Sequence, residues 1–451
     1  MSKQQVEAPV YVSRFEGGSQ ASSGHGTGSS AQARGTQSLG ASLWHDVSGT
    51  GAEVGTLAAA PTDLMEALKE EASGNLVGMV DESKCLALIK AMAPDVSRRI
   101  VSDAQLTANL LAAFNDDELR AAAAVGSREV AEWAFEQRFG IELKGRVENS
   151  AGNQVSENEN ATVPAGGAQV LWQQQDILDV WDVLATLPES HVEENTAIKA
   201  FEAISGNRGF WSPSTGEVQL GQRLNDQSAA RIDHTVRHEI GHAVHDSMRS
   251  TIDAWLNNDI GFRVLGYQRA GCEALVEALG GFPSGVNKTH VLNLLDAYLA
   301  STSWSTKNPI PPGDAEWAKM PNTVHTAVNA SSSNWYQNYK SHPSGVGGRV
   351  FFNHYYENTM VFSAVAEAAI DATGDNYSAM SPAEFFANCY AEYFGNPAGF
   401  VDSSQWGGRL PGPVKAFFRN QVLHRQPYAA PEQPGQVAPT ETTSNTSGLK
   451  R

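Results

Sequence analysis

Two histidines and a glutamate stand together in the segment His238-Glu239-Ile240-Gly241-His242. The surrounding residues contain no proline, and apolar residues recur at helical spacing, so we predict an α-helix here. Histidines four residues apart project from one face of a helix, where two imidazole nitrogens can bind one zinc ion. Glu239 can reach a zinc-bound water without binding the metal, as the general base of a hydrolysis must. The spacing therefore predicts one Zn²⁺ per chain and hydrolytic chemistry.

Two further histidines lie on the same stripe of the predicted helix, namely His234 and His245. His238 and His245 would be about 10 Å apart along a straight helix, which is too far to share one ion. A three-histidine metzincin site needs Gly where this chain has His245 and His where it has Met248, so we exclude that layout. We predict that His234 and His245 are polar-face residues or support the ligands without binding metal.

The third zinc ligand must come from another part of the chain, and a carboxylate is the usual partner of two histidines. The best candidate region is 376–394, in which Ser381-Pro382 is a favourable helix start. Glu384 lies three residues after Ser381, which also matches a capping box. On spacing alone Glu384 is either that cap or a zinc ligand, and Glu392 is the alternative carboxylate.

Three blocks of the chain together resemble the anthrax lethal factor family of zinc metallopeptidases. The blocks are His-Glu-Ile-Gly-His-Ala-Val at 238–244, Tyr377 with Glu-Phe-Phe-Ala at 384–387, and the segment 209–220, which is similar to a hairpin preceding the zinc helix. The resemblance implies that zinc is bound by His238, His242 and Glu384. It also implies that Glu239 polarises the attacking water and that Tyr377 stabilises the oxyanion.

The chain departs from this family in two places. The separation of His242 from Glu384 is much longer than in the family, so we expect an insertion over about 250–350. Asn388 stands one turn after Glu384, where the family tends to carry another glutamate. If Asn388 orients His238, the orienting group is neutral and the basicity of the ligand is lower.

Hydrophobic periodicity and composition divide the chain into five segments. We predict a flexible leader over 1–60, a small all-helical module over 61–145, a polar linker over 146–168, a metallopeptidase domain over 169–428 and a disordered tail over 429–451. The predicted fold class is α+β, a mainly helical metallopeptidase domain with a small mixed sheet, preceded by the helical module.

The helical module resembles modules that accompany the cargo and toxin proteins of bacterial contractile injection systems. The matching residues are Ala93-Pro94-Asp95-Val96, Asp103 with Leu106, and the segment 114–119. This resemblance implies a delivered effector, with a delivery apparatus contacting the N-terminal region. The resemblance to zinc metallopeptidases implies a protein or peptide as substrate. The N-terminus lacks the apolar stretch of a secretory signal. We therefore expect a protein made in the cytoplasm without a cleaved signal peptide and then exported or injected.

Two alternatives to a peptidase stay open on the sequence. One is a non-catalytic cargo or binding module that keeps a zinc helix for stability. The other is a metal-free structural component of a larger assembly, in which His238 and His242 are solvated. Activity that depends on Glu239 separates the first alternative from a peptidase, and a response to chelator separates the second.

Composition excludes several other classes of function. The chain has 451 residues and a net charge of −18, which disfavours binding to nucleic-acid phosphates. No run of apolar residues is long enough to span a membrane. Cys85, Cys272 and Cys389 are far apart and form no CxxC pair, so we predict reduced, partly buried thiols and folding in a reducing compartment.

Overall fold

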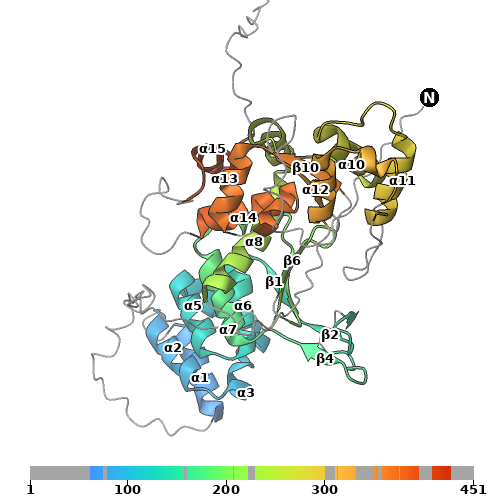
Figure 1. Ribbon diagram of the computed structural model, residues 1–451. Coiled ribbons are helices and arrows are strands. Elements are labelled where there is room, and N and C mark those ends of the chain that lie inside the picture. The colour runs from blue at the N-terminus through green and yellow to red at the C-terminus, as the bar shows by residue number, and fades with distance from the viewer. Residues whose placement is uncertain are drawn as a thin grey trace, which may run out of the picture.

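The computed structural model describes most of the chain between residues 61 and 427 (Figure 1). The described ranges are 61–74, 79–156, 160–206, 208–221, 229–299, 310–311, 313–331, 349–353, 358–374, 376–395 and 409–427. The predicted leader and tail lie outside them. The described part is a mixed α+β structure, mostly helical with small sheets, as the predicted fold class requires. None of its helices combines the length and the apolar character needed to cross a bilayer.

Helices make up most of the described residues of 61–139, and capping residues mark where several of them begin. They are α1 (Pro61–Ala72), α2 (Glu82–Ala91), α3 (Pro94–Ser97), the 3₁₀ turn η2 (Ile100–Ser102), α4 (Ala104–Ala113), α5 (Asp116–Val125) and α6 (Arg128–Phe139). Asp81 and Asp103 each accept a hydrogen bond from the backbone N–H three residues later. Asn115 and Glu118 form a reciprocal capping box at the start of α5. These local signals explain why the helices could be predicted.

The N-terminal helices share one hydrophobic core with the following part of the chain. The ring of Phe135 in α6 lies edge-on to Trp181 of α7 (Gln174–Leu184) and to Phe201 of β5 (Ala200–Ile204), with centroids 6.1 and 6.0 Å apart. Strand β1 (Glu142–Lys144) pairs in parallel with β5. The boundary predicted at residue 145 therefore follows a strand of the main sheet, and 61–145 is neither all-helical nor separate.

The segment 146–168, predicted to be a linker, instead contributes to a three-stranded antiparallel sheet. Its strands are β2 (Arg146–Glu148), β3 (Gln154–Ser156) and β4 (Ala168–Val170), in the order β3-β2-β4. The polar composition is misleading because Arg146 and Glu148 are buried. Arg146 donates to Glu148 at 2.7 Å and to Glu202 of β5 at 3.3 Å. Glu148 also accepts from the backbone N–H of Ser205 at 3.1 Å, which fastens β2 to the end of β5.

The main sheet has the strand order β1-β5-β7-β6, with β6 at one edge. Strand β6 (Gly209–Ser212) and strand β7 (Glu217–Gly221) form an antiparallel hairpin in which Trp211 lies opposite Val218. The turn ends at Gly216, which has a left-handed φ of 75°. This is the hairpin expected ahead of the histidine-bearing helix. Its strand β7 also pairs in parallel with β5.

The remaining helices outside the lobe complete the main core. They are η3 (Glu189–His191), α8 (Ala229–Ser247), α9 (Arg249–Trp255), the π turn η5 (Leu256–Ile260), α13 (Ala364–Thr373), η8 (Asn376–Ala379), α14 (Pro382–Phe394), α15 (Gly412–Phe417) and the π turn η10 (Phe418–Val422). Aromatic rings pack between them. Trp255 stacks on Phe417 with centroids 4.0 Å apart, and Phe386 stacks on Phe418 at 5.2 Å. These contacts hold α9, α14 and the C-terminal helices together.

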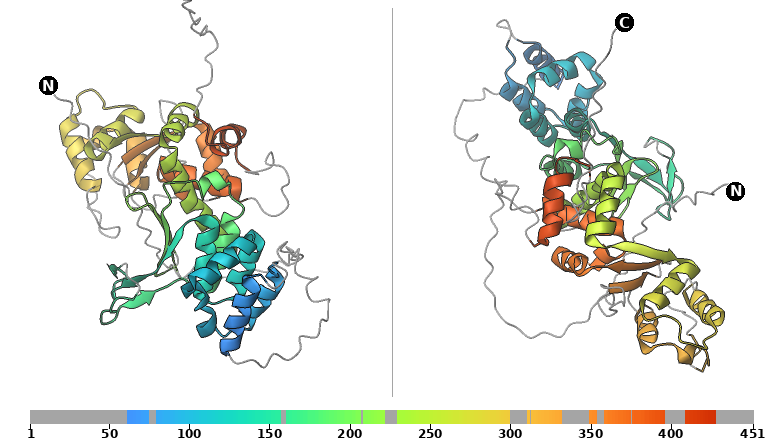
Figure 2. Two further views of the ribbon diagram at one scale, coloured as in Figure 1. Left: turned by 180° about the vertical axis from the view of Figure 1, so that it is seen from behind. Right: turned by 90° about the horizontal axis from the view of Figure 1, so that it is seen from above.

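The predicted insertion forms a lobe with its own small core. Its elements are β8 (Arg263–Tyr267), α10 (Gln268–Ala278), α11 (Lys288–Leu299), η6 (Trp317–Lys319), α12 (Asn322–Ser331), β9 (Arg349–Asn353) and β10 (Asn358–Phe362). The strands form an antiparallel sheet in the order β8-β10-β9. Residues 250–262, placed in the insertion by the sequence, belong to the main core. Figure 2 shows this lobe and helices α1–α6 at opposite ends of the molecule.

All three cysteines are free and buried, as the sequence predicted. Burial raises the pKa of Cys85 to about 11 and holds the pKa of Cys389 well above its usual range. A buried neutral thiol is a poor nucleophile, so neither Cys85 nor Cys389 is activated for covalent chemistry.

Candidate metal centre

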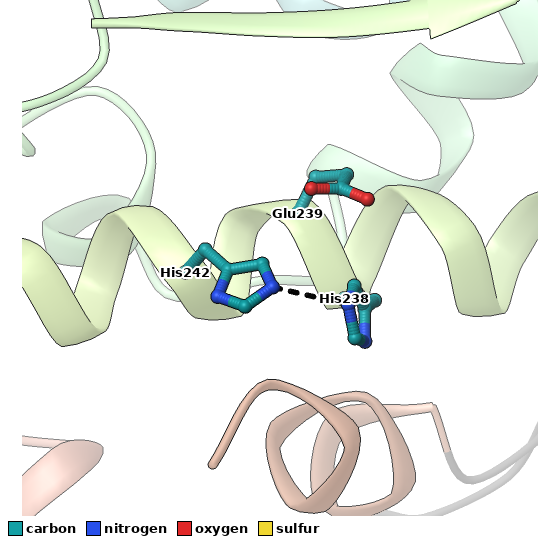
Figure 3. Close-up of side chains that lie close together, drawn as sticks. All are labelled: His238, Glu239 and His242. Atoms are coloured by element: carbon teal, nitrogen blue, oxygen red, sulfur yellow. Dashed lines mark hydrogen bonds between the residues drawn. The ribbon is translucent and has the colours of Figure 1, made fainter. Parts of the chain in front are cut away.

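Helix α8 presents His238 and His242 on one side and Glu239 on another (Figure 3). The Nε2 atoms of the two histidines are 3.1 Å apart, and the rings are nearly perpendicular. His238 is 9% exposed and the apolar residues of α8 pack into the main core. The four-residue spacing in the sequence thus becomes a pair of nitrogens that face one point.

Helix α14 brings Glu384 to the same point. The helix begins with Ser381, whose Oγ accepts from the backbone N–H of Glu384 at 3.1 Å. The Oε2 atom of Glu384 lies 3.1 Å from Nε2 of His238 and 3.2 Å from Nε2 of His242. Glu392, the alternative carboxylate, is paired instead with Arg409. Of the two carboxylates considered from the sequence, Glu384 is the one beside the histidines.

Close contact between the two helices depends on Gly241. A Cβ atom at this position would lie only 3.0 Å from the Cα of Ala387 and 3.0 Å from the Cβ of Tyr390, both in α14. Real Cβ contacts are rarely this short, so a side chain here would push the helices apart. The glycine inside the histidine motif is therefore explained by helix packing.

The three donor atoms form a nearly equilateral triangle with sides of 3.1 to 3.2 Å. Tetrahedral zinc with bonds of 2.0 to 2.1 Å requires ligand atoms about 3.3 Å apart, so this triangle fits one face of such a site. Two imidazoles and one carboxylate are also the donor set of catalytic zinc sites with an open fourth position. Within the described residues, Oε2 of Glu384 is buried and has no hydrogen-bond partner, as expected of an atom that faces a cation.

The environment of Glu384 favours its ionised form. Burial acts to raise the pKa of this carboxyl group, but the charge of His242 and the close approach of both imidazoles to the carboxylate outweigh burial and lower the pKa well below its usual range. Tyr377 in η8 adds a further hydrogen bond, donating from its hydroxyl to Oε1 of Glu384 at 3.0 Å. Glu384 is therefore a fixed anion with one oxygen directed at the two histidines.

Glu239 lies beside this triangle with a different environment. Glu239, His238 and His242 each offer one potential ligand atom, and these three atoms lie within 4.8 Å of one another. Its carboxyl is 5% exposed, and burial raises its pKa to about 7, although nearby His238 acts to lower it. Its Oε2 atom has no hydrogen-bond partner among the described residues. A carboxyl group with this pKa can accept and return a proton near neutral pH.

Edge strand β6 holds Glu239 in place, which sequence analysis did not anticipate. The backbone N–H of Trp211 lies close enough to the carboxylate to lower its pKa. A Cβ atom at Gly209 would lie 2.7 Å from Oε1 of Glu239 and 2.6 Å from Thr235. Gly209, the first residue of β6, is the sequence feature that corresponds to this contact. That it lies against Glu239 is seen only in the folded structure.

The two other histidines of α8, His234 and His245, have different partners. His234 and His238 both contact Asn388 of α14, each at 3.1 Å from its Oδ1 atom. His245 pairs with Asp253 at 2.9 Å. Asn388 is thus placed to orient His238, as considered from the sequence.

The five residues singled out from the sequence, His238, Glu239, His242, Tyr377 and Glu384, therefore lie together at the contact between α8 and α14. A comparison with protein-family models, with curated proteins and with solved structures gave no match to this chain.

Proposed function

We propose that this protein is a zinc-dependent endopeptidase. In this proposal His238, His242 and Glu384 hold the metal, and Glu239 is the general base. The observation that carries the proposal is the triangle of donor atoms with sides of 3.1 to 3.2 Å beside a second buried carboxyl group. A structural zinc site has no need of that second carboxyl group, whereas hydrolysis requires a proton acceptor there.

Bound zinc would supply Lewis-acid chemistry, polarising a peptide carbonyl and acidifying water. Glu239 takes the proton from the attacking water and passes it to the leaving amine, and its buried carboxyl group beside the donor triangle is placed for both transfers. Trp211 and Gly209 keep the carboxylate in position on the side of strand β6. Tyr377, 9% exposed, supplies a neutral hydroxyl donor to the oxyanion that develops on the carbonyl.

We propose that substrate binds in extended form along β6. This strand lies at the edge of the main sheet and contacts the general base through Trp211. An edge strand can pair with an extended peptide through main-chain hydrogen bonds. Such binding suits a protein or peptide substrate better than a compact small molecule.

The first test combines metal analysis with a peptide-library assay on the whole chain. Wild-type protein should retain about one zinc per chain, and His238→Ala/His242→Ala should retain none. Glu239→Gln should keep the zinc and the melting temperature but lose hydrolysis, because the amide cannot accept the proton. Zinc retained with no hydrolysis that depends on Glu239 would favour a non-catalytic module. Failure of the wild type to bind zinc after loading and dialysis would overturn the proposal.

A further inference from the structure

The amide of Asn388 lies between two histidines of helix α8. It is 1% exposed, and its Oδ1 atom is 3.1 Å from Nδ1 of His238 and 3.1 Å from Nε2 of His234. Its Nδ2 atom is buried and has no hydrogen-bond partner among the described residues. The amide is therefore held by its oxygen alone.

This arrangement fixes which nitrogen of His238 carries the proton. An amide oxygen only accepts hydrogen bonds, so Nδ1 of His238 must donate. In a neutral imidazole the other nitrogen then has a free lone pair, and here that atom is Nε2, which faces His242 and Glu384. If the amide turned over, its NH₂ group would donate to Nδ1, and the proton of His238 would move to Nε2. That tautomer cannot bind a metal at Nε2.

We propose that His234 is a positioning residue of the metal centre, acting through Asn388 on the tautomer of His238. Its Nε2–H donates to the same Oδ1 atom, so turning the amide over would force both histidines to change tautomer. His234 thereby favours the amide orientation in which His238 is ready to bind zinc. The inference rests on the zinc site proposed above and gives His234 a role beyond that of a polar-face residue.

A carboxylate at position 388 would need no such support. Both of its oxygens accept hydrogen bonds, so turning the group over changes nothing for His238. The proposal therefore predicts that the effect of His234 on zinc binding depends on the amide at position 388. Such coupling is measured by comparing the same substitution in two backgrounds.

The test measures zinc dissociation constants by chelator competition on the full chain. Four proteins are compared: wild type, His234→Ala, Asn388→Asp and the double variant. His234→Ala should weaken zinc binding by about tenfold or more in the wild type, as is typical of groups that orient a ligand. The same substitution should cause no loss in the Asn388→Asp background. His245→Ala is the matched control, because His245 is on the same helix but pairs with Asp253.

Two results would overturn the role of His234. One is wild-type zinc affinity in His234→Ala, and the other is an equal loss in both backgrounds, which would indicate a packing defect. If His234→Ala does not melt cooperatively, His234→Phe replaces it, since phenylalanine keeps the bulk of the ring but has no N–H. Failure of the wild type itself to bind zinc would instead overturn the proposed function.

Discussion

Two buried carboxyl groups lie beside the same pair of histidines, and their surroundings drive their pKa values in opposite directions. The two histidines hold the pKa of Glu384 well below its usual range, whereas burial raises the pKa of Glu239 to about 7. Neighbouring carboxyl groups separated in this way can take different roles, one as a permanent anion and the other as a proton carrier. This contrast supports Glu384 as the ligand and Glu239 as the base.

The hydroxyl of Tyr377 has two possible roles, positioning Glu384 and stabilising the oxyanion, and kinetics can separate them. Its hydroxyl donates to Glu384, yet the proposed mechanism needs it at the oxyanion. We expect Tyr377→Phe to lower kcat by about 10²- to 10³-fold at saturating zinc, because an oxyanion donor is lost. Steady-state kinetics over a zinc titration checks this. Full recovery of kcat on adding zinc would contradict it and restrict the hydroxyl to positioning Glu384.

Gly209 lies against Glu239, the proposed general base. A methyl group at this position would lie 2.7 Å from Oε1 of Glu239, so Gly209→Ala must displace the carboxylate or the strand. We expect zinc content to be unchanged and kcat to fall by about 100-fold, the typical effect of a misplacement of about 1 Å. Gly313→Ala is the control, since a Cβ atom there has no neighbour within 4 Å. Wild-type activity in Gly209→Ala would exclude the proposed contact between β6 and the base.

At the level of elements, His191 joins three segments of the chain. It lies in η3, its Nδ1 is 2.9 Å from the hydroxyl of Tyr390 in α14, and its Nε2 is 2.8 Å from the carbonyl of Val422 in η10. The carbonyl can only accept, so Nε2 donates and Nδ1 of the neutral ring accepts from the tyrosine. Protonation of His191 would remove that acceptor and place a charge in the core.

Acid should therefore weaken the contacts of His191 with Tyr390 and Val422 and lower the stability of the fold. Burial lowers the pKa of His191 to about 4 in the folded protein, below its value of 6.5 in the unfolded chain. The contribution of neutral His191 to the free energy of unfolding is complete above pH 6.5 and is lost as the pH falls towards 4. The loss amounts to at most about 3 kcal/mol. We expect His191→Gln to reduce the change in the free energy of unfolding between pH 7 and pH 4.5. Urea unfolding in the presence of a chelator measures this change.

Other groups do not obscure this measurement. Burial raises the pKa of Asp176 to about 6, so its contribution has the opposite sign and stabilises the fold as the pH falls through 6. Asp176 is present in wild type and in His191→Gln, so the difference between them isolates the histidine. His424→Gln, at an exposed position, is the control. An unchanged pH dependence in His191→Gln would refute the assignment.

The site was predictable from the sequence because its chemistry is local to two helices. The histidine spacing of α8 and the capped start of α14 are visible in single segments. Strand β2 was not predictable in the same way, since Arg146 and Glu148 look solvated until Glu202 of β5 is placed beside them. The partner of Gly209 was hidden for the same reason. Contacts between distant segments decide these features.

At the level of the whole molecule, the predicted boundary between module and peptidase domain can be tested directly. A chain that begins at residue 169 lacks β1 and the ring of Phe135, which packs on Trp181 and Phe201. Loss of one buried phenylalanine side chain alone costs about 3 to 5 kcal/mol, a large part of the stability of a typical domain. We expect no cooperative thermal unfolding from this chain, in contrast to the full protein. If the shortened chain unfolds cooperatively and binds zinc, the predicted domain boundary is supported.

The boundary was not visible in the sequence because helical periodicity shows that a face is apolar but not what covers it. Helices α5 and α6 have apolar faces of ordinary size, and these faces pack against α7 and β5. The described residues of 61–139 are therefore part of the scaffold on which the site is built. Any role in delivery would have to use their outward surfaces.

The lobe between β8 and β10 departs from the main body and returns to it at neighbouring points. Tyr267 at the end of β8 lies directly opposite Asn358 at the start of β10. Without the intervening residues 268–357, a tight turn could close these two strands into an ordinary hairpin. The two ends of the lobe are thus held together by the pairing of β8 with β10.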